Sequence, residues 1–318
     1  MRTKEKLSCL VSFIVLIVLC SLFCQSECQA TLIEIYGYGM EDPEELAFDS
    51  MGNLYVGHSR NASGMTIYQI PDGGGEAIDW PSSGKPFVDP DGLDVDGMDR
   101  IWGTTGAWSN VQDGEVIYVS SNGTIEAIGK NYLRNPTSLE LDRNGRFGSA
   151  GSVVVANQSQ AVGGIEIISV TPDPLDISSI FSTNDYNVIR CLSFDSDNTL
   201  WFVGGEKLFS WTEQDNQPEE FELSGITDGI SAVGVDPYFG GLVIGLIDER
   251  AVARVSLDGN FDIIATGLDP RSFAFDSQGR IYVSDQVSDV VWVIPEPSTL
   301  LLLAMGGLAM LRRKHRQF

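Results

Sequence analysis

The sequence predicts an all-β fold, a six-bladed β-propeller over residues 31–294, from three observations. One phrase occurs six times: a short apolar alternation that ends in aspartate, then a turn, then a second apolar run. Between their aspartates, successive copies are 47, 46, 53, 41 and 40 residues apart, which is the length of one propeller blade. No segment of this region shows the apolar period of about 3.6 residues that would predict a helix.

Each copy predicts the first two strands of a blade, because β-branched and aromatic residues alternate with polar ones and a turn follows the aspartate. In two copies that turn contains Gly52 or Gly279, which can adopt the positive φ of a hairpin turn. The expected strand pairs are 46–49 with 54–56, 93–96 with 101–102, 139–142 with 153–155, 192–195 with 200–203, 233–236 with 242–244, and 273–276 with 281–283. Third strands are expected at 65–70, 116–119, 164–170, 207–211, 251–257 and 290–294. Fourth strands follow in five copies, for example at 124–128 and 261–265.

The sixth copy stops after its third strand, while an unassigned strand-like run stands at residues 32–36. We expect this N-terminal run to pair with the last blade as its fourth strand. Such pairing would close the ring between the first and last blades and leave no open sheet edge.

The charge balance excludes several classes of partner. The chain has 20 Lys+Arg and 44 Asp+Glu, a net charge of −24, and residues 31–294 alone hold 13 basic and 41 acidic residues. Such a surface would repel nucleic acid and anionic lipid. A mean hydropathy of +0.01 and a moderate proline content exclude a polytopic membrane protein and a disordered chain.

Residues 1–30 have the pattern of a secretory signal peptide: a positively charged start, an apolar core, and small residues before a cut after Ala30. The apolar run is long, so an uncleaved membrane anchor is the alternative. Four of the five cysteines lie in this segment. Only Cys191 remains in the mature chain, where no intramolecular disulfide can form, and its apolar strand predicts a core position.

Residues 295–318 combine the sequence Pro295-Glu296-Pro297, a short apolar run and an arginine-rich end. This segment resembles the PEP-CTERM sorting signal. The resemblance implies a Gram-negative host, export with the help of signal peptidase, and a transient hold in the inner membrane through the C-terminal apolar helix. It also implies removal of the tail near the Pro-Glu-Pro motif by an exosortase, a membrane transpeptidase. The protein would then reside at the cell surface or in the extracellular matrix.

The repeated phrase, as in residues 42–56 and 269–285, resembles the NHL repeat and, more broadly, six-bladed gluconolactonase-like (senescence marker) and strictosidine synthase-like proteins. Gluconolactonase-like proteins hold a divalent cation, usually calcium, in the propeller channel with acidic and amide side chains from separate blades. The resemblance therefore makes Glu44 and Asp91 candidate metal ligands.

A polar ring is expected around the channel, at the position five residues before each repeated aspartate. Its members are Glu44, Asp91, Thr137, Arg190, Ser231 and Arg271. The two arginines would oppose a bound calcium ion, and the alternative interpretation is that the acids and arginines pair with one another across the channel mouth.

The sequence predicts no catalytic residue. His58 is the only histidine of residues 31–294, and no G-x-S-x-G motif surrounds a serine. The aspartates around Asp94 and Asp195 lack the order of a calcium-binding EF-hand loop and are interpreted as turn residues. Trp80, Trp108 and Trp211 are candidates for stacking on sugar rings, although Trp211 ends a strand and is expected to pack.

These observations predict a non-enzymatic exported propeller that binds a polysaccharide or a protein at the cell surface and needs no cofactor. The alternative is a calcium-dependent gluconolactonase-like hydrolase with the metal in the channel.

Overall fold

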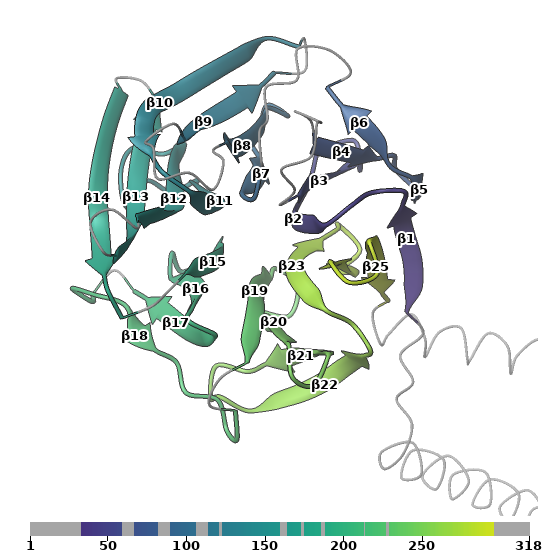
Figure 1. Cartoon of the computed structure of the whole chain (residues 1–318). Helices are drawn as coiled ribbons and strands as arrows, with labels where there is room; N and C mark the ends of the chain where they lie inside the picture. Colours follow the sequence, from purple (N-terminus) through teal and green to yellow (C-terminus); the bar gives the residue numbers. More distant parts are fainter. Residues whose placement is uncertain are drawn as a thin grey trace, which may run out of the picture. The chain divides into compact units, whose positions relative to one another are not determined.

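The computed structural model describes residues 33–58, 67–81, 90–105, 114–120, 123–159, 164–172, 175–185, 188–212, 214–226 and 229–295. These residues form six sheets of mainly antiparallel strands, and the sheets follow one another around a ring (Figure 1). The predicted six-bladed β-propeller is confirmed. None of the described residues is helical, and they contain no helix of a length and apolarity to cross a membrane. The predicted signal peptide of residues 1–30 and the sorting segment after Pro295 lie outside the described residues.

Five blades are built from strands that are consecutive or nearly consecutive in the sequence. The first blade contains β2 (Pro43–Phe48), β3 (Leu54–His58), β4 (Ile67–Ile70) and β6 (Ile78–Trp80). The second contains β7 (Leu93–Val95), β8 (Ile101–Thr105), β9 (Gly114–Val119) and β10 (Ile125–Leu133). The third contains β11 (Pro136–Asp142), β12 (Ser152–Ser159), β13 (Gly164–Pro172) and β14 (Leu175–Thr183).

The remaining strands complete the ring in the same order. The fourth blade contains β15 (Ile189–Phe194), β16 (Leu200–Gly204), β17 (Lys207–Trp211) and β18 (Glu219–Glu220). The fifth contains β19 (Ile230–Asp236), β20 (Gly241–Leu246), β21 (Ala251–Val255) and β22 (Phe261–Thr266). The sixth contains β23 (Pro270–Phe275), β24 (Ile281–Asp285), β25 (Val290–Ile294) and β1 (Glu34–Tyr38), to which β5 (Gly75–Glu76) adds a parallel strand.

The N-terminal strand closes the ring as predicted. β1 pairs antiparallel with β25, so that Glu34 lies opposite Val293 and Gly37 opposite Val291. The sixth sheet therefore joins the two ends of the propeller chain, and its last strand is covered rather than left as an open edge. The strand begins at Glu34 and runs to Tyr38, slightly later than the predicted 32–36.

The repeated aspartate is a turn residue, which explains the repeat. In the second blade, the Asp96 carboxylate accepts hydrogen bonds from the amides of Met98 and Arg100, from Arg100 Nε at 2.5 Å and from Trp102 Nε1 at 2.9 Å. Asp276 makes the same contacts with the corresponding residues of the sixth blade. One side chain thus satisfies the turn amides and fixes the start of the second strand.

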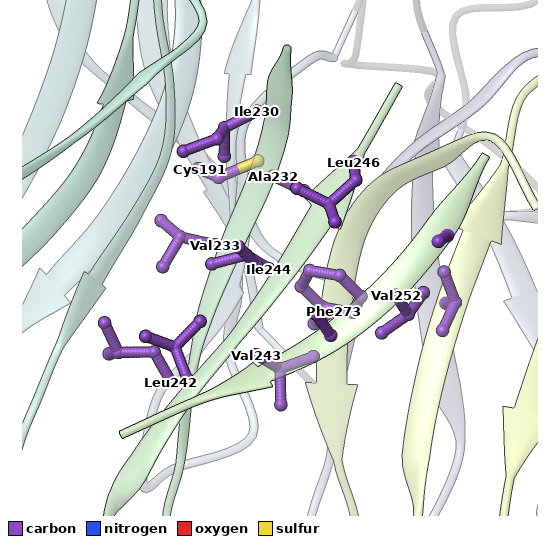
Figure 2. Close-up of a cluster of buried hydrophobic side chains, with 14 of the residues drawn as sticks. Cys191, Ile230, Ala232, Val233, Leu242, Val243, Ile244, Leu246, Val252 and Phe273 are labelled. Carbon is purple, nitrogen blue, oxygen red and sulfur yellow. The ribbon is translucent and has the colours of Figure 1, made fainter. Parts of the chain in front are cut away.

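The apolar core lies between blades. The largest cluster joins the fourth, fifth and sixth blades, where Val233 and Ile244 of the fifth blade pack with Cys191 and Phe273 from its two neighbours (Figure 2). Cys191 is 5% exposed, as predicted for a core residue. Because each sheet buries both faces against its neighbours, second strands such as β16 and β20 are almost wholly apolar.

Candidate functional site at the centre of the ring

A hydrogen-bonded cluster around Glu45 lies at the centre of the ring. Glu45, on the innermost strand of the first blade, accepts hydrogen bonds from Ser138 Oγ at 2.7 Å and from Ser272 Oγ at 3.0 Å. Ser138 belongs to the third blade and Ser272 to the sixth. Since the first and third blades are not neighbours in the ring, this carboxyl group reaches across its centre.

Two hydrogen bonds between a side chain and a backbone group extend the cluster to the fourth blade. Ser138 Oγ accepts a hydrogen bond from the Leu192 amide at 3.0 Å, and Cys191 Sγ donates one to the Arg271 carbonyl at 2.9 Å. Cys191 has a φ of 52°, a left-handed conformation that is uncommon outside glycine. Four of the six blades are therefore tied together near the axis by polar contacts.

Burial gives the Glu45 carboxyl unusual acid–base behaviour. Its removal from water, opposed by the two serine hydrogen bonds and reinforced by the negative charges of Glu44 and Asp94, raises the pKa of Glu45 to about 8. The group therefore carries a proton at neutral pH. Burial likewise raises the pKa of the Cys191 thiol, and the nearby Glu45 charge adds to the effect, so this thiol is a poor nucleophile.

A second polar group lies between the second and third blades. Asp94 accepts hydrogen bonds from the Leu141 amide and from Arg143, both at 3.0 Å, and Arg143 lies 3.4 Å from Glu140. Burial and the charge of Asp94 raise the pKa of Glu140, while the Arg143 guanidinium opposes this rise. These contacts join neighbouring blades. Asp94 is a buried residue of β7 and not a turn residue, so its interpretation as a turn aspartate is wrong.

The residues of the predicted polar ring make contacts of several kinds. Thr137 Oγ1 donates to the Ile189 carbonyl at 2.6 Å and Ser231 Oγ to the Pro270 carbonyl at 2.7 Å, so each links its blade to the next. Glu44 accepts a hydrogen bond from Gln286 at 3.0 Å, and Arg271 lies 3.2 Å from Asp269. Asp91 and Arg190 are half-buried, just before β7 and within β15. The channel role of this ring stays a prediction.

The structure bears on the two candidate metal ligands, Glu44 and Asp91. Among the residues that the structure describes, no group of three or more His, Cys, Asp or Glu side chains is arranged to hold a metal ion. Glu45, which adjoins Glu44 in sequence, is protonated at neutral pH and would be a weak ligand for a hard cation. The role of Glu44 and Asp91 as metal ligands stays a prediction.

The other candidate residues are placed as follows. His58 is buried beside Tyr68, with ring centroids 5.4 Å apart. Trp211 packs against Phe147 in the core, as expected, whereas half-buried Trp80 packs edge-on against Tyr55. Trp108 lies outside the described residues. Neither of the two described tryptophans is freely presented for stacking on a sugar.

The sequence reasoning missed Glu45, although a signal was available one position further along each repeat. Four residues before the repeated aspartates stand Glu45, Gly92, Ser138, Cys191, Ala232 and Ser272. Five of these residues are small and one is large and acidic. Space left by small side chains at equivalent positions of the ring admits one long side chain at its centre, and two of the small residues are hydroxyl donors.

The C-terminal segment matches a known sorting signal. The family described as the PEP-CTERM protein-sorting motif matches residues 293–316, which include Pro295, Glu296 and Pro297. The chain carries a PEP-CTERM motif. This motif indicates an exported protein of a Gram-negative bacterium that is held in the membrane and then processed by an exosortase. It covers a small part of the chain and describes delivery, not what the propeller does.

Comparisons with solved structures show the fold. The chain is similar to a gluconolactonase from Xanthomonas campestris, at 15% identity over 83% of this chain and 89% of that one, with a TM-score of 0.63. It is also similar to the calcium-binding protein regucalcin from Agrobacterium tumefaciens (14%, 81% and 94%, TM-score 0.59). A chain of the nidogen/laminin complex shows a similar fold (17%, 70% and 80%, TM-score 0.55). No curated protein sequence matches the chain.

Proposed function

We propose that this protein is a surface-delivered binding propeller without catalytic activity, whose ligand is a polysaccharide or another protein. The observation that carries the proposal is the Glu45 cluster. Each oxygen of its carboxyl group accepts a hydrogen bond from a serine hydroxyl group, one in the third blade and one in the sixth. The polar atoms at the centre of the ring therefore hold the blades together. We therefore assign binding to the loops and faces of the ring. A chain with a similar fold is part of the nidogen/laminin complex.

Delivery supports the same proposal. The PEP-CTERM motif sends the chain out of the cell, and the strongly acidic propeller keeps such molecules apart and soluble there. We propose boundaries at residues 1–30 for the signal peptide, 31–294 for the propeller and 295–318 for the sorting segment. Mass spectrometry of the protein released by an exosortase-competent host tests them: we expect an N-terminus at Thr31 and a C-terminus near Pro295–Pro297.

Retention on extracellular polymer tests the binding function. The processed protein, purified from the host, is passed over immobilised exopolysaccharide from that host and, separately, over its surface proteins. We expect retention on one of the two and release by the same polymer in solution. Dextran serves as the control polymer, and heat-unfolded protein controls for non-specific adhesion. The proposal is contradicted if the protein is retained on neither material.

A second candidate is a calcium-dependent, gluconolactonase-like hydrolase with Glu44 and Asp91 as metal ligands. It is favoured by the resemblance of the fold to gluconolactonase and to calcium-binding regucalcin. A thermal melt in excess EDTA and then in millimolar calcium distinguishes the two functions, because a ligand of the folded state raises the Tm. Only a rise that is lost in both Glu44→Ala and Asp91→Ala, and kept in the control Asp262→Ala on β22, supports the hydrolase.

A further inference from the structure

The chain enters and leaves the propeller at one place. Ile294, the last residue of β25, lies opposite Ile281, the first residue of β24, which follows the turn after Asp276. Glu34, the first residue of β1, lies opposite Val293. Both ends of the propeller chain therefore emerge at the face that carries the turns between first and second strands, which we call the turn face.

The turns of the other blades belong to the same face. The innermost strands of neighbouring blades contact one another around the ring, and their turns are linked directly. Ser50 in the first-blade turn donates to Asp99 in the second at 2.6 Å, and Asn144 in the third donates to Asn198 in the fourth at 2.5 Å. The turn face is thus linked across two blade boundaries, between the first and second blades and between the third and fourth.

The turn face also carries exposed apolar side chains at its most prominent points. Met51 is 70% exposed, Met98 65% and Phe239 60%, each at the tip of a turn between first and second strands. Leu257 projects from a turn between third and fourth strands of the same face and is 62% exposed. The turn face therefore presents several apolar side chains on one side of the ring, and a surface of this kind can meet an apolar partner.

The sorting segment brings such an apolar partner, the lipid bilayer, close to the turn face. Five residues, 295–299, separate Ile294 from the apolar run that starts at Leu300. Five extended residues span roughly 17 Å. While the tail is in the membrane, the edge of the turn face at β25 cannot be further from the bilayer surface than about this distance. An uncleaved N-terminal anchor would hold the same face, because Glu34 lies beside Val293.

We propose that, before processing, the turn face rests on the phospholipid bilayer, with Met51, Met98 and Phe239 in the lipid interface. The opposite face, which carries Val287 between β24 and β25, is then turned away from the membrane. Because the propeller has 41 acidic and 13 basic residues, attraction to anionic lipid does not hold it there. The short tether supplies the proximity and the apolar turn tips supply the contact. This inference rests on the PEP-CTERM motif and not on the proposed ligand.

Site-specific fluorescence tests the orientation. The full chain is prepared with Cys9, Cys20, Cys24 and Cys28 replaced by serine and with Cys191→Ser. Single cysteines are then introduced by Met51→Cys, Met98→Cys, Phe239→Cys or Val287→Cys and labelled with the dye NBD. The protein is reconstituted through its tail into phosphatidylcholine vesicles, and quenching by doxyl-labelled lipid is compared between positions. Val287 is 68% exposed and is the matched control on the opposite face.

We expect the three turn-face probes to be quenched at least about twofold more strongly than the probe at position 287. Equal quenching at all four positions, or none at the turn-face positions, overturns the proposal. A concentration-dependent spectral shift without lipid quenching would also overturn it, because it would assign the turn face to a second copy of this chain. Failure of the full chain to float with the vesicles removes the tether and overturns it as well. None of these outcomes bears on retention by polysaccharide or protein.

Discussion

Carboxylates occupy two very different regions of this propeller, the turns and the centre of the ring. In the turns, Asp96 and Asp276 are partly buried, which alone would raise their pKa values, yet hydrogen bonds from backbone amides and from Trp102, Arg100, Tyr282 and Arg280 hold those values below the usual range. At the centre, the effect of burial is larger than that of the hydrogen bonds and ion pairs that oppose it, so the pKa values of Glu45 and Glu140 are raised. What decides the direction is the number and strength of donors, since both regions are removed from water.

The two regions also differ in how they repeat. The turn aspartate recurs in all six copies, because in every blade its carboxylate accepts hydrogen bonds from backbone amides of the turn that follows it. The central position differs from copy to copy, because six side chains share one space around the axis and only one of them can be long. Repetition therefore marks local requirements, and divergence at equivalent positions marks a contact that all blades share.

The largest loss of stability is expected where one carboxylate accepts hydrogen bonds from four donors. Asp96→Ala leaves two amides, Arg100 Nε and Trp102 Nε1 without their acceptor, and the Trp102 ring is fully buried. We expect a loss of about 2–4 kcal/mol in the free energy of unfolding. Urea denaturation followed by tryptophan fluorescence measures it. Asp197→Ala, an exposed aspartate in the equivalent turn of the fourth blade, is the control, and a loss as large there would refute the role of Asp96.

The next effect concerns the small residues at the centre. A Cβ added at Gly92 would stand 2.7 Å from the backbone of Ser138 and Leu139, so Gly92→Ala must push the second and third blades apart. We expect a loss of about 1–3 kcal/mol. At Gly97, in the turn of the same blade, an added Cβ meets nothing within 4 Å. Gly97→Ala should therefore change the denaturation midpoint little, and equal losses in the two variants would show that the centre is not tightly packed.

Much of the fold was predictable from the sequence, because strand alternation and turn chemistry are local. The third strands of the fourth and sixth blades, 207–211 and 290–294, were predicted to the residue, and the closing strand was correct within two residues. Glu45 was not found, since its partners Ser138 and Ser272 are 93 and 227 residues away and only closure of the ring brings them together. Cys191, by contrast, was assigned to the core from its apolar neighbours alone.

The smallest effect concerns the protonation of Glu45. An unfolded glutamate releases its proton near pH 4.5, whereas folded Glu45 keeps it to about pH 8. Because the folded state binds the additional proton between these values, the contribution of Glu45 to stability is complete below about pH 4.5 and declines as the pH rises to about 8. Glu45→Gln mimics the protonated form at every pH: its oxygen can accept from Ser138 and its amide can donate to Ser272.

We therefore expect Glu45→Gln to raise the Tm at pH 8 by a few degrees and to leave the Tm at pH 4.5 nearly unchanged. The decline of Tm between these pH values should become flatter but not vanish, because Glu140 has a raised pKa as well. Glu222→Gln removes the same charge from an exposed position and should leave the difference between the two pH values as it is. Parallel curves for wild type and Glu45→Gln would mean that Glu45 is ionised at neutral pH, and the contrast between the turns and the centre would then fail at Glu45.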